Sequence, residues 1–216
     1  MAKTIVIGDI HGCYDELIAL LDKVELGADD RVVGVGDLTV KGPKNKEVLD
    51  LFMNDQRFSS VLGNHDRALL RYTKGLTVSL KSSQERAYKE LQTGGEQYFE
   101  FLDTLPYLID LGSYVVVHAG LRPGVANEQQ NEDDLTELRT LGPDRTSREG
   151  TPWYQEYAGP QTVLFGHWPA AEPRRGRFAL GVDTGCVYGY DLTAYIIESD
   201  EIISVKAKQA YSSPSK

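Results

Sequence analysis

All four histidines of this 216-residue chain stand in short motifs that contain or adjoin a glycine. The motifs are Gly8-Asp9-Ile10-His11-Gly12, Gly63-Asn64-His65-Asp66, Val117-His118-Ala119-Gly120 and Phe165-Gly166-His167-Trp168. A fifth motif, Val35-Gly36-Asp37, carries a carboxylate without a histidine. Carboxylate and amide oxygens mixed with imidazole, without a cysteine cluster, suit Mn²⁺, Fe or Zn²⁺ more than a structural zinc. The five motifs therefore predict a metal site assembled from across the chain.

Two metal ions can lie about 3.5–4 Å apart when one carboxylate binds both of them. Asp37 is the single predicted ligand of its motif, so we predict that it bridges the two ions. The other ligands form two groups: Asp9 and His11 for one ion, and Asn64, His118 and His167 for the other. Such a pair suits hydrolysis of a phosphate ester or anhydride, because it lowers the pKa of a bridging water and clamps the phosphoryl oxygens.

His65 is predicted to act as a general acid rather than as a ligand. The leaving oxygen of a phosphate ester or anhydride needs a proton, and a positioned imidazole can donate one. Asp66, the next residue, is predicted to orient that imidazole and keep it protonated. The alternative is that His65 is a third ligand of one of the ions.

Each motif follows a short run rich in β-branched or aliphatic residues, so we expect it where a strand ends. In open α/β sheets, ligands bind at the carboxyl ends of strands, where the loops converge on one rim. Residues 1–65 alternate strand and helix, which indicates parallel βαβ units. The expected strands are Thr4–Ile7, Arg31–Val35 and Ser59–Leu62, and the expected helices cover Leu17–Val24 and Val48–Phe52.

The rest of the chain has a different pattern. Residues 68–110 are charged and helical, and we expect them to form a helical insertion that borders the substrate. Residues 122–161 are rich in Gly, Pro and charge, with a short helix around Leu135–Leu138. Further strands are expected at Tyr114–Val117, Thr162–Phe165, Phe178–Val182, Thr193–Ile197 and Ile202–Val205. The last of these lack long helices between them, which favours antiparallel pairing in a second sheet.

These elements predict an α/β fold, in which two mixed β-sheets form a sandwich flanked by helices. The length fits one domain with a full core, and we place that domain at residues 1–206. Residues 207–216 are small and polar, so we expect them to form a flexible tail.

Composition limits the class of protein. Hydrophobic residues make up 41% and charged ones 25%, as in soluble globular proteins. No apolar run approaches the roughly 20 residues of a membrane helix, and no signal sequence is recognisable, so we expect a cytoplasmic protein. The net charge of −9 argues against broad binding to nucleic acid or membranes. Bound divalent cations would reverse the potential locally, which still allows a phosphorylated substrate. The oligomeric state is not predicted.

The motifs resemble those of the phosphoprotein-phosphatase-type metallophosphoesterases, which have the calcineurin-like fold. The nearer likeness is to bacterial symmetrical diadenosine tetraphosphatases and the ApaH-like phosphatases. Three stretches carry it: Asp9–Val24 (DIHGCYDELIALLDKV), Trp168 of the Gly-His-Trp motif, and Val182–Thr193 (VDTGCVYGYDLT). The resemblance implies a four-layer αββα sandwich and the ligand and acid roles given above. It also implies two divalent ions, usually Mn²⁺, with Fe, Co or Zn as alternatives.

The second motif departs from the family pattern. It commonly reads Gly-Asp-x-Val-Asp-Arg-Gly, whereas this chain has Thr39-Val40-Lys41-Gly42 at the corresponding end. Loss of the second Asp is shared by the symmetrical tetraphosphatases, and Lys for Arg is similar to the ApaH-like branch. Lys41 is predicted to hold substrate phosphate as a movable point charge rather than as a bidentate fork.

A second phosphate contact is expected between His118 and His167. Arg139 is similar in position to a substrate-binding arginine of these enzymes, and we predict that it binds substrate. Its rivals are Arg122, Arg145 and Arg148.

The resemblance implies hydrolysis of diadenosine tetraphosphate to two ADP by metal-activated water, with a small nucleotide as substrate. A serine/threonine or broad-specificity phosphoprotein phosphatase is the main alternative, and a triphosphate-capped RNA end is another substrate to consider. The non-enzymatic alternative is a metal-stabilised binding module that has no turnover. Val182-Asp183-Thr184-Gly185 also resembles an aspartic protease loop, but that chemistry needs two such aspartates and the chain has one copy. Asp183 is therefore predicted to support the metal rim.

Overall fold

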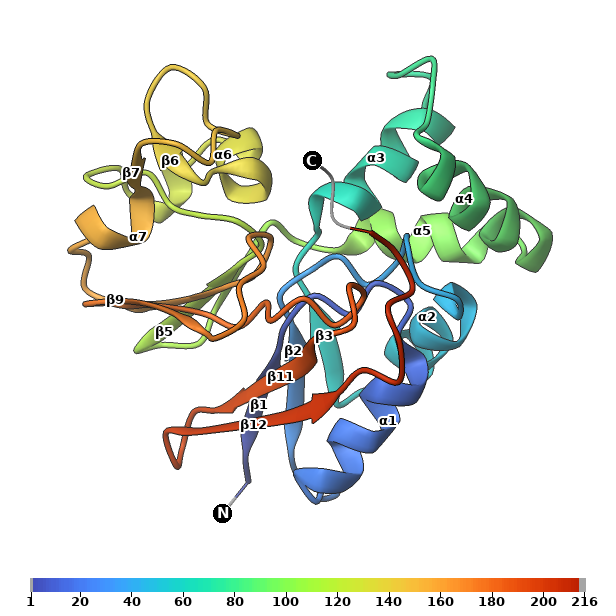
Figure 1. The fold of residues 1–216 in the computed structure, drawn as a ribbon, viewed down its shortest axis with the longest axis horizontal. Coiled ribbons are helices and arrows are strands. Elements are labelled where there is room, and N and C mark those ends of the chain that lie inside the picture. The colour runs from blue at the N-terminus through green and yellow to red at the C-terminus, as the bar shows by residue number, and fades with distance from the viewer. Residues whose placement is uncertain (1, 214–216) are drawn as a thin grey trace.

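The computed structural model describes residues 2–213, whose longer strands form two five-stranded sheets (Figure 1). The first sheet has the order β12-β11-β1-β2-β3. Its strands are β1 (Thr4–Ile7), β2 (Arg31–Gly34), β3 (Phe58–Ser60), β11 (Asp191–Ile196) and β12 (Glu201–Lys206). β1, β2 and β3 are parallel, as the alternation of strand and helix predicts, and β11 and β12 are antiparallel to their neighbours.

The second sheet has the order β4-β5-β8-β10-β9. Its strands are β4 (Leu108–Asp110), β5 (Tyr114–Val117), β8 (Thr162–Phe165), β9 (Arg174–Gly176) and β10 (Ala179–Gly181). The three central strands β5, β8 and β10 are parallel, and the edge strands β4 and β9 are antiparallel to them. A separate small hairpin joins β6 (Thr140–Leu141) and β7 (Thr151–Pro152).

The predicted antiparallel pairing of the last two strands is confirmed, since β11 pairs with β12, but their predicted place in a second sheet is wrong. β11 and β12 instead join the first sheet, where Ile196 of β11 pairs with Ile5 of β1. The local pattern predicts that each segment is extended, but it does not encode which distant strand is the partner.

Alternating side chains along the strands create separate apolar layers. Ile5 and Ile7 of β1 face a helical layer, whereas Val6 packs between the two sheets. Val116 of β5 also packs between the sheets, while its neighbours face outward. This two-residue period follows from the pleat of a strand. The core between the sheets consists of Val6, Val33, Val35, Val61, Val116, Leu164, Leu180, Val182 and Tyr195.

Helices cover both outer faces of the sandwich (Figure 1). α1 (Tyr14–Lys23) and α2 (Asn45–Asn54) pack on the first sheet, through residues such as Leu17 and Leu49. The short helices α6 (Glu132–Glu137) and α7 (Trp153–Glu156) pack on the second sheet, with the buried Trp153 at their centre. The predicted arrangement of two mixed sheets flanked by helices is confirmed.

Three more helices follow β3 and precede β4 along the chain: α3 (Asn64–Thr73), α4 (Ser82–Gly94) and α5 (Gln97–Thr104). Their aromatic rings contact each other, with Tyr88 of α4 lying 5.0 Å from Tyr72 and 5.3 Å from Phe99 between ring centroids. The 3₁₀ turn η1 (Asn127–Gln129) precedes α6. No helix within residues 2–213 is both long and apolar enough to cross a membrane.

The C-terminal segment is packed against the domain rather than frayed. The backbone amide of Lys208 and the hydroxyl of Tyr211 donate to Oε1 of buried Glu16, over 2.9 and 2.8 Å. The amides of Tyr211 and Ser212 donate to the carbonyl of Val187. The expected flexible tail is therefore wrong for residues 207–213, because acceptors distant in sequence hold them. Residues 214–216 lie outside the described part of the chain.

Candidate active site

The five motifs meet at the carboxyl ends of the parallel strands. Asp9 and His11 follow β1, Asp37 follows β2, His118 follows β5 and His167 follows β8. Asn64, His65 and Asp66 form the first turn of α3, which follows β3. Strands that run parallel end on the same edge, so the sheets bring together residues that are up to 158 positions apart.

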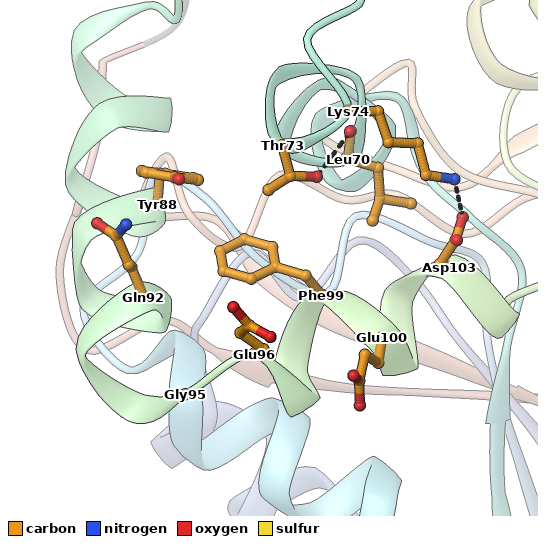
Figure 2. A pocket seen from close by; sticks show the side chains of 10 residues that line it. All are labelled: Leu70, Thr73, Lys74, Tyr88, Gln92, Gly95, Glu96, Phe99, Glu100 and Asp103. Carbon is orange, nitrogen blue, oxygen red and sulfur yellow. Dashed lines mark hydrogen bonds and ion pairs between the residues drawn. The ribbon is translucent and has the colours of Figure 1, made fainter.

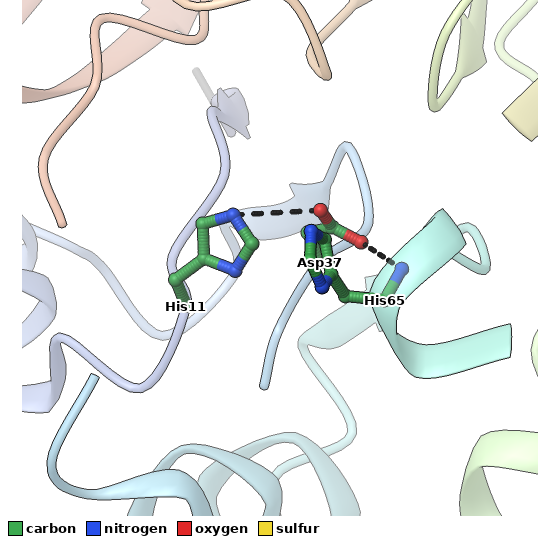
Figure 3. Close-up of side chains that lie close together, drawn as sticks. All are labelled: His11, Asp37 and His65. Carbon is green, nitrogen blue, oxygen red and sulfur yellow. Dashed lines mark hydrogen bonds and ion pairs between the residues drawn. The ribbon is translucent and has the colours of Figure 1, made fainter. Parts of the chain in front are cut away.

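Asp37 lies at the centre of the cluster. Its Oδ2 is 3.4 Å from His11 Nε2, and its Oδ1 is 3.6 Å from His118 Nε2. The backbone amide of His65 donates to Oδ1 over 2.9 Å, which directs the positive end of α3 at this carboxylate. Figure 3 shows Asp37 between the ring of His11 and the start of α3. The position is the one that a bridging ligand needs, and the bridging role stays a prediction.

The remaining ligand-type groups lie on either side of Asp37. Asn64 Oδ1 is 2.9 Å from His118 Nε2 and 3.0 Å from His167 Nδ1. The backbone amide of His167 donates to both oxygens of Asp9, over 3.1 and 3.2 Å. Asp9 Oδ2 is 3.9 Å from His11 Nε2. The structure thus brings together all six residues that the sequence predicts as metal ligands.

Backbone carbonyls fix the orientation of two imidazoles. Nδ1 of His11 lies 3.0 Å from the carbonyl of Thr39, and Nδ1 of His118 lies 2.8 Å from the carbonyl of Val35. A carbonyl only accepts hydrogen bonds, so Nδ1 carries the proton in each neutral ring. Each Nε2 then keeps its lone pair and lies within 3.6 Å of Asp37, as in metal sites where the second nitrogen is held by the protein.

The loops around the cluster have an unusual backbone conformation. Seven non-glycine residues within 2–213 have a positive φ, and five of them lie in these loops: His11, Asp37, Val40, Lys41 and His167. Left-handed backbone costs a side chain about 1–2 kcal/mol. Such strain persists where surrounding contacts enforce it, which is common at functional sites.

Two of the motif glycines are required because other groups approach them closely. A Cβ on Gly63 would lie 2.1 Å from the amide nitrogen of Asp37, and one on Gly166 would lie 2.0 Å from Asp9 Oδ1. The glycines therefore let the loops pack against one another at the cluster.

Burial disfavours the charged form of every titratable ligand. Burial raises the pKa of Asp37 to about 6, and burial with repulsion from Asp183 and Asp37 raises the pKa of Asp9 well above its usual value. Burial lowers the pKa of His118 to about 4, and it holds the pKa of His11 and of His167 well below normal. The cluster therefore combines crowded carboxylates with neutral imidazoles.

Divalent cations fit this donor set. They bind neutral imidazole and carboxylate and would relieve the repulsion between Asp9 and Asp37. Nε2 of His167 is buried without a hydrogen-bond partner, an arrangement that is costly unless the nitrogen binds something else. Two triads of potential ligand atoms lie within 4.8 Å of one another, Asp9-Asp37-His118 and His11-Asp37-His65.

Asp183 belongs to the same buried cluster although it was not among the predicted ligands. It follows β10, and burial raises its pKa to about 6. The amide of Gly185 donates to its Oδ1 over 3.0 Å. The signal in the sequence is its position after a strand, which it shares with Asp9 and Asp37.

The expected pairing of Asp66 with His65 is wrong. Both carboxylate oxygens of buried Asp66 accept from the 37–39 loop, one from the amide of Leu38 and the other from the amide and hydroxyl of Thr39. Nδ1 of His65 is buried without a partner. Adjacent residues of a helix point in different directions, so neighbours in sequence seldom face each other.

Two of the predicted phosphate-binding cations lie at the cluster. Lys41 Nζ is 2.8 Å from His11 Nε2 and 5.3 Å from the ring centroid of Tyr188. Arg139 is partly buried and donates to the carbonyl of Thr146 over 3.0 Å. Burial raises the pKa of Asp37, and the charge of Arg139 opposes that rise, after the charge of Lys41 and the amide of His65.

The rivals of Arg139 are placed differently. Arg122 and Arg145 form ion pairs with Asp134, at 2.7 and 3.3 Å. Arg148 approaches Arg139, whose pKa is lowered by burial and then by this neighbour. Arg139 is therefore better placed than Arg122 and Arg145 to reach a substrate.

A hollow of about 370 Å³ lies elsewhere, between α3, α4 and α5 (Figure 2). Phe99 and Tyr88 form its apolar wall, and Glu96, Glu100 and Asp103 surround it. None of the predicted site residues lines it. Its acidic surround also disfavours an anionic substrate.

Comparison with known proteins shows the family of the chain. A family model described as calcineurin-like phosphoesterase matches residues 2–200. This chain belongs to the calcineurin-like phosphoesterase family. It is thus a metallophosphoesterase and a hydrolase, which confirms the assignment from the motifs. Calcineurin-like phosphoesterases use two divalent metal ions.

Similar proteins include enzymes named for dinucleotide hydrolysis. The asymmetrical bis(5'-nucleosyl)-tetraphosphatase PrpE of Bacillus subtilis is 32% identical over 232 residues, which cover 95% of each chain. A symmetrical bis(5'-nucleosyl)-tetraphosphatase of Vibrio campbellii is 26% identical and covers 94% of this chain and 98% of its own. A crystal structure of a candidate diadenosine tetraphosphatase has a TM-score of 0.83 and 34% identity, and it covers 95% of this phosphoesterase and 94% of that chain.

Proposed function

We propose that this phosphoesterase hydrolyses a phosphoanhydride bond of a dinucleoside tetraphosphate. The observation that carries the proposal is the cluster of six ligand-type side chains, with Asp37 at its centre and Lys41 and Arg139 beside it. Metal ions neutralise the phosphoryl group under attack, whereas the two cations can bind the further charges of a polyphosphate chain. The names of the relatives at about 30% identity support the same class of substrate.

The proposed ligands are those predicted from the sequence. Asp9, His11 and Asp37 would hold one ion, and Asp37, Asn64, His118 and His167 would hold the other, with Mn²⁺ the first candidate. When bound, the two ions would activate water and stabilise the charge that builds on the phosphoryl oxygens.

The side chains of the protein have separate tasks. Lys41 and Arg139 orient the phosphates, and His65 donates a proton to the leaving oxygen. Asp66 is a positioning residue, because its carboxylate holds the amides of Leu38 and Thr39 next to Asp37. The proximity of His65 to His11 and Asp37 also favours the alternative of a third ligand, so its role needs a direct test.

The names of the relatives bear on which bond is cut. The sequence predicts symmetric cleavage into two ADP, which stays untested. Seven relatives at 28–32% identity are named asymmetrical, whereas the symmetrical one is 26% identical. We therefore propose asymmetric cleavage of diadenosine tetraphosphate into ATP and AMP.

Chromatography of the products tests both points. Purified protein with Mn²⁺ should convert diadenosine tetraphosphate to equal amounts of ATP and AMP, and p-nitrophenyl phosphate should be a poorer substrate. Two ADP would restore the symmetric prediction. If diadenosine tetraphosphate is inert and a phosphopeptide turns over rapidly, the proposal is wrong and a protein phosphatase activity takes its place.

A further inference from the structure

A second cleft adjoins the cluster on the side of the helices. It has a volume of about 520 Å³ and is lined by α3, by residues 77–84 and by Asp133 and Glu137 of α6. Asn64, one of the proposed metal ligands, forms part of its wall. The cleft thus shares a wall residue with the centre, unlike the hollow in Figure 2.

Three cations line the cleft, Arg67, Arg71 and Lys81, against two carboxylates, Asp133 and Glu137. Arg67 is paired with Asp133 at 2.7 Å and Glu132 at 3.5 Å. Arg71 and Lys81 also line the cleft, but neither forms an ion pair within residues 2–213. In a chain of net charge −9, two such cations beside a phosphohydrolase centre are a specific feature.

The loop above the cleft exposes apolar side chains. Leu76 and Val78 are 61% and 95% exposed, and they are two of the three large hydrophobic residues that are exposed within 2–213. They lie in the connection between α3 and α4, which stands clear of the rest of the fold in Figure 1. Thr77, Ser79 and Leu80 of the same loop line the cleft. Apolar surface beside unpaired cations matches a nucleoside linked to phosphates.

We propose that this cleft binds the part of the substrate that lies beyond the scissile bond, with Arg71 and Lys81 contacting the distal phosphates and the 74–81 loop contacting the nucleoside. The inference rests on the proposed function and assigns a place to the second nucleotide. Lys81 lines the cleft at the start of α4, where it is the N-cap residue. Arg71 lies at the end of α3, two helical turns from Asn64.

Arg71→Ala and Lys81→Ala test the proposal. Each variant should raise KM for diadenosine tetraphosphate roughly tenfold, since a charge-assisted contact of about 1.4 kcal/mol is lost. KM and kcat for p-nitrophenyl phosphate should not change, because that substrate has no distal phosphates. Lys89→Ala is the matched control: it removes the same charge from α4 at an exposed position that does not line the cleft.

The outcomes separate a failure of the cleft proposal from a failure of the proposed function. If wild-type protein cleaves the dinucleotide and both variants retain its KM, the cleft proposal is overturned and the proposed function stands. If wild-type protein does not cleave the dinucleotide, the proposed function fails. Calorimetry of inorganic tripolyphosphate binding to metal-free protein then tests whether the cleft binds phosphate chains, because it needs no turnover. Weaker binding by both variants than by Lys89→Ala then supports a phosphate-chain site, and equal binding by all three rejects it.

Discussion

The strand-end loops and the helices α3–α5 border the same centre but are built differently. Five non-glycine residues of the loops have a positive φ, whereas none of the non-glycine residues from 64 to 104 has one. A Cβ on Gly63 would collide with Asp37, whereas Gly75, at the end of α3, has no atom within 4 Å of such a Cβ. The loops and the first turn of α3 therefore fix the chemistry and tolerate little change, while the rest of the helical side can vary to suit the substrate.

The largest loss should follow removal of the shared carboxylate. Asp37→Ala should lower turnover by more than the roughly 10⁴-fold that a general acid contributes at most, because both ions lose a ligand. Elemental analysis should find up to two transition-metal ions per wild-type chain and a larger loss of metal in Asp37→Ala than in His11→Ala. Equal metal loss in the two variants would refute the bridging role.

His65→Asn should lower kcat by about 10²–10⁴-fold while both metal ions remain bound. The loss should be smaller for p-nitrophenyl phosphate than for an alkyl phosphate, because a good leaving group needs little protonation. If metal leaves together with the imidazole, His65 is a ligand instead.

Gly63→Ala tests the difference between the two regions directly. The new methyl group meets backbone at 2.1 Å, so we expect a loss of about 3 kcal/mol in the free energy of unfolding and a lower metal content. Gly75→Ala, with a φ of 68° but open space, should cost only about 1 kcal/mol and leave metal content unchanged. Thermal unfolding measures both, and similar values for the two variants would contradict the comparison.

Asp66→Asn should separate positioning from ligation. The carboxylate of Asp66 accepts from two backbone N–H groups with its two oxygens, whereas the asparagine side chain has only one acceptor oxygen. The variant should therefore lose about 2 kcal/mol in the free energy of unfolding. We expect kcat to fall roughly tenfold with metal still bound, as for residues that support ligands. Asp103→Asn on α5, which breaks an exposed ion pair with Lys74, is the control and should leave kcat unchanged.

Tyr211→Phe should have the smallest effect. The loss of one hydrogen bond to Glu16 should cost about 1 kcal/mol, and a chain of this size then unfolds about 2–4 °C lower. Activity should not change at temperatures well below the midpoint. A midpoint equal to that of the wild type would mean that the bond contributes nothing.

The same contrast explains what the sequence could predict. Asp9, Asp37 and His167 were found because a β-branched run followed by a glycine motif is a local pattern for a strand that ends at a rim. The partner of β11, the position of residues 207–213 and the choice of Arg139 over Arg122 depend on distant contacts, such as the pair of Arg122 with Asp134. The direction of Asp66 was missed for a geometric reason, because it starts a helix in which consecutive side chains diverge.

The order of strands in the first sheet also bears on how the protein is made. β1, which leads to Asp9, lies between β2 and β11, so its second edge stays unpaired until residues 191–196 have been synthesised. At about 5–20 residues per second, that interval lasts roughly 10–40 s on the ribosome. Pairings so remote in sequence also slow folding. The sheet that supports Asp9 and Asp37 is thus completed only once residues 191–196 have been synthesised, long after both aspartates.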